Sequence, residues 1–207
     1  MKILSHRGYW IKETEKNTKT AFLRSFKNGF GTETDVRDLN GKLVISHDPA
    51  TGDEMTFKDF LLFCPHSVPL AFNIKADGLA GKINEELLLF PNIDWFVFDM
   101  SIPDMRSYLE KKNPVFARMS EVERDAPWIE LCDGVWLDAF DDVWYDDCTI
   151  ENILNSGKKI CIVSPELHKR DYWNVWDMIK RRPEFMGSDR LYLCTDYPEK
   201  AKKYFGL

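Results

Sequence analysis

The chain has 207 residues, of which 44% are hydrophobic and 30% are charged, a balance that excludes wholesale disorder. Its 34 acidic and 28 basic side chains give a formal net charge of −6, which argues against a dedicated nucleic-acid binder. At about 150 residues per domain, the length favours a single domain over residues 1–207.

Nothing in the sequence predicts an integral membrane segment. The longest apolar run, residues 60–64, is far shorter than the roughly 20 residues that a spanning helix needs. Only Ile3 and Leu4 precede polar residues at the N-terminus, too few for the core of a signal peptide. The five cysteines are odd in number and form no C-x-x-C pair, so a zinc site or disulfide framework is not expected. These features favour a cytoplasmic protein, and they leave the oligomeric state open.

Short apolar runs alternate with longer amphipathic stretches along the chain. The expected strands cover residues 2–5, 32–37, 70–74, 95–98, 115–118, 134–137, 159–163 and 191–194. The expected helices cover residues 18–28 with Asn17 as N-cap, a short helix opened by the capping box 56–59, residues 80–90, a helix beginning at 101–104, a short stretch near 121, and residues 149–154, 172–180 and 198–204. Residues 42–46 form a further extended piece after the turn 39–41.

Alternating strands and helices predict parallel strands joined by helical crossovers. Eight such units indicate an α/β protein with a (β/α)8 TIM barrel, although a doubly wound open sheet produces the same order of elements. Eight units in 207 residues leave about 26 residues each, near the lower limit for this barrel. We therefore expect a compact barrel without large insertions.

The carboxyl ends of the first expected strands carry a group of polar residues suited to phosphate chemistry. Glu33 and Asp35 lie two apart on an extended chain, so their side chains share one face, where a hard cation such as Mg²⁺ or Ca²⁺ would relieve their repulsion. Taken alone, such a pair is more often surface charge. The other polar residues at these ends are His6, Arg7, His47, Asn73 and Lys75.

This combination can cleave a phosphodiester. Metal, arginine and lysine stabilise anionic oxygens. One imidazole can remove a proton from the nucleophile while the other supplies a proton to the leaving alkoxide. A lone histidine at a strand end is more often structural, so the prediction depends on the coincidence of all these residues.

At these residues the sequence resembles the glycerophosphodiester phosphodiesterase family, including its relatives the spider-venom-type sphingomyelinases D. The matching blocks are H-R-G at 6–8, N-T-K-T-A-F at 17–22, E-T-D-V at 33–36, G-K-L-V-I-S-H-D at 41–48, N-I-K at 73–75 and T-D-Y-P at 195–198. The resemblance implies a (β/α)8 barrel, a divalent metal (Mg²⁺ or Ca²⁺), and hydrolysis of small phosphodiesters of the glycerophosphocholine type.

The resemblance also implies a role for each matching residue. The acid/base pair would be His6 and His47, the phosphate-binding cations Arg7 and Lys75, and two metal ligands Glu33 and Asp35. Asn73 stands where the family has a third acidic ligand, so one negative charge is lost. We expect Asn73 to ligate through its carbonyl oxygen, or Asp99 on the next strand to restore the charge.

Other departures from the family concern the substrate. Lys16 replaces the acidic residue expected before Asn17, and only residues 49–69 stand where the family has a longer insertion. The barrel mouth should therefore be open. Asp138 and Trp136 could select a cationic headgroup by charge and cation–π attraction, although a solvated acidic loop fits Asp138 better. His168 is expected to be an exposed loop histidine.

Three functions remain open from the sequence. The first is a metal-dependent phosphodiesterase. The second is a metal-independent, phospholipase C-like phosphodiesterase that uses the two histidines and Arg7. The third is a catalytically silent phosphate-binding barrel that lost turnover together with the third acidic ligand.

Overall fold

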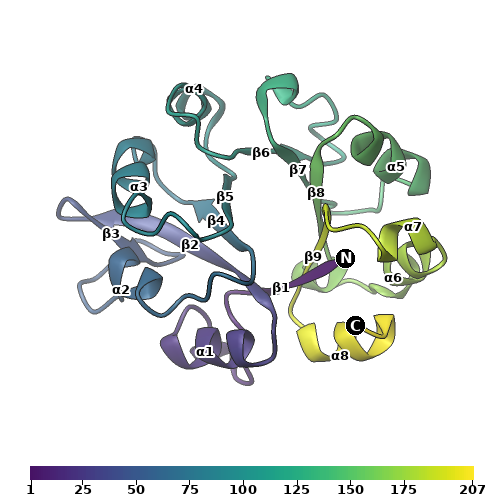
Figure 1. Cartoon of the computed structure of the whole chain (residues 1–207), viewed down its shortest axis with the longest axis horizontal. Coiled ribbons are helices and arrows are strands. Elements are labelled where there is room, and N and C mark those ends of the chain that lie inside the picture. The colour runs from purple at the N-terminus through teal and green to yellow at the C-terminus, as the bar shows by residue number, and fades with distance from the viewer. The chain divides into compact units, whose positions relative to one another are not determined.

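Strands and helices alternate through residues 1–207 of the computed structural model (Figure 1). The strands are β1 (Lys2–His6), β2 (Gly31–Leu39), β3 (Lys42–Ile45), β4 (Leu70–Ile74), β5 (Trp95–Phe98), β6 (Phe116–Met119), β7 (Gly134–Leu137), β8 (Lys159–Val163) and β9 (Leu191–Thr195). The α-helices are α1 (Lys19–Lys27), α2 (Phe57–Leu61), α3 (Ala80–Leu87), α4 (Ile102–Glu110), α5 (Asp147–Asn155), α6 (Trp173–Lys180), α7 (Pro183–Met186) and α8 (Pro198–Phe205). Short 3₁₀ turns are η1 (Glu13–Glu15), η2 (Ile129–Leu131) and η3 (Pro165–His168).

The chain divides into two compact units, residues 5–115 and residues 1–4 together with 116–207. In the first unit β2, β4 and β5 run parallel in the order β5-β4-β2, and β3 pairs with β2 in the antiparallel sense. In the second unit β6, β7, β8 and β9 run parallel in sequence order. Without β3, eight strands alternate with helical segments, which confirms the predicted α/β class and (β/α)8 fold.

Aromatic side chains build the core of the first unit. Phe22 of α1, Phe57 and Phe60 of α2 and Phe72 of β4 are all fully buried. The rings of Phe22 and Phe60 meet edge to face with centroids 4.7 Å apart, and those of Phe57 and Phe72 at 4.9 Å. Edge-to-face packing of this kind stabilises beyond the area that it buries. The short helix α2, which occupies the segment between β3 and β4, is thereby held against the sheet.

Helix starts follow local capping chemistry. The Thr56 hydroxyl accepts from the amide of Asp59 at the start of α2, as the capping box predicts. At α1 the prediction was one residue off, because Thr18 and not Asn17 is the N-cap, and its hydroxyl accepts from Ala21 N. The helical stretch expected near 121 was also wrong. Ser120 and Glu123 form an antiparallel bridge there.

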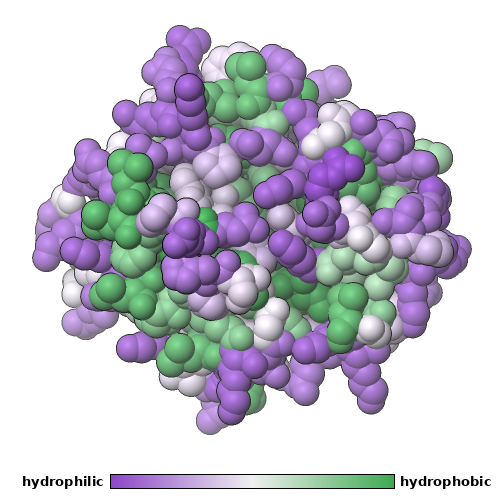
Figure 2. All heavy atoms as spheres, in the orientation of Figure 1, coloured by the Kyte–Doolittle hydropathy of each residue, from purple (hydrophilic) through white to green (hydrophobic).

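The surface carries both hydrophilic and hydrophobic side chains. Figure 2 shows a face on which hydrophilic side chains predominate, with smaller hydrophobic patches between them. None of the helices combines the length and the apolar character needed to cross a membrane.

Candidate active site

A left-handed turn follows β1 and is hydrogen-bonded to β2. Arg7 and Gly8 have φ values of 56° and 84°. The Arg7 amide donates to Glu33 Oε2 at 3.1 Å, and the Gly8 amide donates to Thr32 Oγ1 at 3.0 Å. A Cβ on Gly8 would lie 2.7 Å from the Cβ of Ala21, so only glycine lets the turn pack this closely on α1. The H-R-G block therefore orients two backbone N–H groups toward β2.

Two carboxylates of β2 lie buried beside this turn. Glu33 is 1% exposed and Asp35 is fully buried, and the alternation of a strand places both on one face. His6 Nε2 lies 3.9 Å from Glu33 Oε2. Burial and the neighbouring Asp35 charge raise the pKa of Glu33, while Arg7 and Lys75 oppose the shift. A buried acid pair of this kind is stable only with positive charge nearby.

Two basic side chains supply part of that charge. Arg7 Nε lies 2.9 Å from Asp35 Oδ2, and Lys75 Nζ lies 3.4 Å from Asp35 Oδ1. The same ammonium is 4.0 Å from Asp99 Oδ2, just after β5, where Asp99 has a positive φ of 69°. Lys75 thus stands between the carboxylates of Asp35 and Asp99. Both basic side chains are about one-fifth exposed, so a solvent-borne anion can reach them.

Asn73 is the register partner of Asp35 on the neighbouring parallel strand β4. Side chains paired in this way stand on the same face of a sheet. The Oδ1 atoms of Asn73 and Asp35 are both buried and lack a hydrogen-bond partner, although Lys75 Nζ lies 3.4 Å from the Asp35 oxygen as an ion pair. Buried polar atoms without a partner are uncommon and call for an explanation. These two oxygens, together with the carboxylate of Glu33, fit the oxygen donor set that a hard divalent cation takes.

Asn17 is a site residue that sequence reasoning read only as a helix cap. Its Nδ2 donates to Asp35 Oδ2 at 2.8 Å, and its Oδ1 accepts from the Thr34 hydroxyl at 2.9 Å. The backbone amide of Asn17 donates to the Arg7 carbonyl at 2.9 Å, and the backbone φ of Asn17 is 59°. Asn17 therefore orients Asp35. Its place in the N-T-K-T-A-F block was the available signal.

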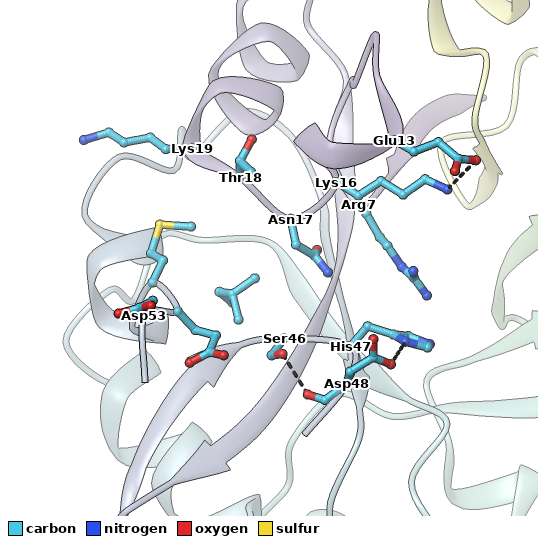
Figure 3. A pocket seen from close by; sticks show the side chains of 13 residues that line it. Arg7, Glu13, Lys16, Asn17, Thr18, Lys19, Ser46, His47, Asp48 and Asp53 are labelled. Atoms are coloured by element: carbon cyan, nitrogen blue, oxygen red, sulfur yellow. Dashed lines mark hydrogen bonds and ion pairs between the residues drawn. The ribbon is translucent and has the colours of Figure 1, made fainter. Parts of the chain in front are cut away.

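The β2–β3 hairpin returns the chain to the level of the carboxylates. Ile45 pairs with Val36, and the Ser46 amide donates to the Asp35 carbonyl at 3.1 Å. His47 follows, with a side chain that is 45% exposed and with Nδ1 2.9 Å from Asp48 Oδ1. His47 and Arg7 line one cavity of about 560 Å³ (Figure 3). The second predicted histidine therefore lines the same cavity as Arg7.

Trp136 and Asp138 belong to the other unit, where they are buried at 5% and 7% exposure. Asp138 Oδ1 lies 2.7 Å from His168 Nε2 and also accepts from the Ala139 amide. Asp138 is thus no solvated loop residue, and His168 is no exposed loop histidine, because it is half-buried against this carboxylate.

A further group of possible ligands, Asp146 to Cys148, is already engaged: Asp146 caps α5 and Asp147 pairs with Arg182.

The unit of residues 5–115 therefore brings together most of the predicted site. A chain of pairwise contacts links His6, Glu33, Arg7, Asp35, Lys75 and Asp99 in that order, with Asn73 beside Asp35 and His47 at the adjoining cavity.

Comparisons with known proteins agree with the fold. No protein-family model matches the chain, and no curated protein matches it either. Solved structures do match. A glycerophosphodiester phosphodiesterase from Agrobacterium tumefaciens aligns at 15% identity and a TM-score of 0.70, over 99% of this chain and 98% of its own. A glycerophosphodiester phosphodiesterase from Parabacteroides distasonis aligns at 17% identity and a TM-score of 0.64, over 99% of this chain and 96% of its own.

A glycerophosphoryl diester phosphodiesterase, also from Parabacteroides distasonis, aligns at 13% identity and a TM-score of 0.57, over 99% of this chain and 86% of its own. All three likenesses extend over nearly the whole chain. At identities this low they establish architecture. The chain therefore has the (β/α)8 fold of the glycerophosphodiester phosphodiesterases.

Proposed function

We propose that the chain is a metal-dependent phosphodiesterase that hydrolyses a glycerophosphodiester or a similar small phosphodiester. The observation that carries this proposal is the meeting of Glu33, Asp35 and Asn73 with two basic side chains and His6 in one unit. The fold shared with glycerophosphodiester phosphodiesterases supports it. The fold alone would not support it, because the same barrel fold occurs in proteins with many unrelated activities.

The donor set supports a hard divalent cation. Glu33, Asp35 and Asn73 would hold Mg²⁺ or Ca²⁺ through oxygen atoms, two of which are buried without hydrogen-bond partners. When bound, such an ion supplies positive charge for the phosphate oxygens and for the charge that develops on them. The ion would also stabilise Glu33 as a carboxylate, against the burial that raises its pKa.

The remaining roles, phosphate binding and proton transfer, would fall to side chains of the chain itself. Arg7 can bind a phosphate oxygen through guanidinium N–H groups that Asp35 leaves free, and Lys75 can bind another as a point charge. Of His6 and His47, one would take the proton of the attacking oxygen and the other would protonate the departing alkoxide. Glu33 Oε2 lies 3.9 Å from His6 Nε2, and Asp48 Oδ1 lies 2.9 Å from His47 Nδ1.

A second candidate is a metal-independent phosphodiesterase with the same histidines. Arg7 and Lys75 already lie within 4 Å of Asp35, so part of the charge that a metal would neutralise is neutralised by the chain itself. Asn73 removes one further negative charge relative to the family pattern. This candidate predicts full activity in EDTA, whereas the first predicts its loss.

Hydrolysis of bis(p-nitrophenyl) phosphate tests the proposal. We expect turnover with Mg²⁺, Mn²⁺ or Ca²⁺ and none in EDTA, and a loss of about 10²–10⁴-fold in His6→Ala and in His47→Ala. Glu33→Gln should raise the metal concentration needed for half-maximal activity. His66→Ala is the matched control, since His66 is an exposed histidine of the same unit outside the site. Wild-type rates in His6→Ala and Glu33→Gln would overturn the site assignment, and diester binding without any product would point to a silent barrel.

A further inference from the structure

The cavity that His47 and Arg7 line adjoins the carboxylate site through Arg7, which contacts Asp35. Its other walls come from the segment that leads into α1 and from the loop after β3. Lys16 lines this cavity, at the position where the sequence departs from the acidic residue of the family pattern. In Figure 3 the Lys16 and Arg7 side chains start from neighbouring positions, the Lys16 ammonium pointing toward Glu13 and the Arg7 guanidinium toward His47.

Lys16 is held in place by the same framework that forms the end of β1. The amide of the next residue, Asn17, donates to the Arg7 carbonyl at 2.9 Å. The Trp10 indole donates to the His6 carbonyl at 3.1 Å, and the ammonium of Lys16 lies 4.5 Å from the centroid of that ring. A cation–π contact of this kind fixes a lysine while it leaves the N–H groups available. The side chain of Lys16 is 25% exposed.

The other charged groups of the cavity are largely engaged elsewhere. Glu54 accepts from the amides of Thr51 and Gly52, and Asp48 faces His47. Lys19 lies over the Phe63 ring at 5.2 Å, and in Figure 3 it points away from Lys16.

The partner of Lys16 among the acids is Glu13, at 3.8 Å. Its side chain is 84% exposed, and such a surface pair contributes little. Asp53 lies across the cavity from Lys16 in Figure 3. Lys16 is therefore the cation that a ligand beside Arg7 would meet next.

We propose that Lys16 determines substrate specificity by binding a second anionic group, a carboxylate or a phosphate, on the alcohol portion of the diester. This inference rests on the proposed function, in which Arg7 binds the diester phosphate. A charge-assisted contact from a partly buried ammonium discriminates against a substrate that lacks the anion. The chain would accordingly prefer diesters with an anionic headgroup over those with a purely cationic one.

Two diesters that differ by one carboxylate test this inference. Glycerophosphoserine carries the carboxylate that glycerophosphoethanolamine lacks, and kcat/KM is measured for both. We expect the wild type to favour the serine diester about tenfold, which corresponds to about 1.4 kcal/mol. In Lys16→Met the ratio should fall to about unity, and in Glu13→Gln, which removes the competing acid, it should rise.

Lys19→Met is the matched control, a lysine of the same cavity whose loss should leave the ratio within about twofold of wild type. A wild-type ratio at or below unity, or a ratio that Lys16→Met leaves unchanged, would overturn the inference.

Calorimetric binding of the same two diesters separates this inference from the proposed function. Hydrolysis of both diesters with no Lys16-dependent preference would overturn the role of Lys16 and keep the phosphodiesterase. Tighter binding of the serine diester that Lys16→Met abolishes, without any turnover, would keep the role of Lys16 and overturn the phosphodiesterase. Neither binding nor turnover of either diester would overturn both.

Discussion

Asp35 of β2 and Asn73 of β4 are register partners on neighbouring parallel strands, and each has a buried Oδ1 without a hydrogen-bond partner. Two such oxygens on one face of a sheet carry a cost, which the Lys75 ammonium offsets in part at 3.4 Å from Asp35 Oδ1 and which a bound cation would offset further. Of the two side chains only Asp35 is charged, and Arg7, Lys75 and Asn17 contact its carboxylate. Asn73 adds no charge. The pair therefore sets how much negative charge the site offers to a metal.

Asn73→Glu should tighten metal binding. The substitution adds a carboxylate beside Asp35, and affinity for Mg²⁺ or Ca²⁺ rises with ligand charge, so the dissociation constant should fall about tenfold or more. In EDTA the same variant should unfold at a lower temperature than wild type, because three neighbouring carboxylates, two of them buried, then repel one another. Calorimetric titration with each ion and thermal unfolding with and without EDTA measure both effects. Equal affinities in Asn73→Glu and wild type would show that the metal does not bind between β2 and β4.

Gly8→Ala should destabilise the fold far more than an alanine at another left-handed glycine. A Cβ at Gly8 would lie 2.7 Å from the Ala21 Cβ, and φ is +84°. Strain and overpacking together should cost about 3 kcal/mol or more. Gly29 has a similar φ of +78° but nothing within 4 Å, so Gly29→Ala should cost only about 1 kcal/mol. Urea unfolding with unchanged m-values measures both, and equal costs would contradict the close packing on α1.

Much of the fold could be predicted from the sequence because the buried strands appear in it as short apolar runs. The expected strands at 70–74, 95–98, 134–137 and 159–163 match β4, β5, β7 and β8 to the residue. Helix starts were less certain wherever two capping residues stand together. Asn17 and Thr18 are both good N-caps; in the structure Thr18 caps the helix, and the Asn17 side chain instead donates to the distant Asp35. Local propensity holds no information on such a tertiary contact.

The site could be predicted in its composition but not in its connections. Spacing along β2 predicts that Glu33 and Asp35 share a face, since that follows from strand geometry. It does not predict that Lys75 stands between Asp35 and Asp99, nor that Trp10 supports Lys16, because both contacts depend on side-chain conformations. The pairing of His168 with Asp138, thirty residues apart, was missed for the same reason.

Asn17→Asp should destabilise the protein through charge. The substitution replaces the Nδ2 donor to Asp35 Oδ2 with a carboxylate oxygen beside a fully buried carboxylate, while aspartate still tolerates the positive φ. The loss should be at least about 2 kcal/mol at neutral pH. Asn17→Gly is the control, since it removes the same hydrogen bond without adding charge. The free energies of unfolding in urea should rank wild type above Asn17→Gly and Asn17→Gly above Asn17→Asp, and the reverse order of the two variants would contradict the contact.

His168 should make stability depend on pH around neutrality. Its Nε2 lies 2.7 Å from Asp138 Oδ1, and both side chains are largely buried. The hydrogen bond to Asp138 raises the pKa of His168 above its usual value, helped by the charges of Asp138 and Glu121 and opposed by burial and by Arg170. A raised pKa means that the folded state binds the proton more tightly than the unfolded chain does. The stabilisation is therefore fully present below the unfolded value of about 6.5 and is lost as the pH rises through the higher folded value.

His168→Gln removes this titration and keeps a polar side chain. We expect the wild type to exceed the variant in free energy of unfolding by about 1–2 kcal/mol more at pH 5.5 than at pH 9. Urea unfolding of both proteins across this range measures the difference. His66→Gln is the control, because that exposed histidine should give a difference that does not change with pH by more than about 0.5 kcal/mol. A flat difference for His168→Gln, or one that grows toward alkaline pH, would show that the protonated His168–Asp138 pair does not stabilise the fold.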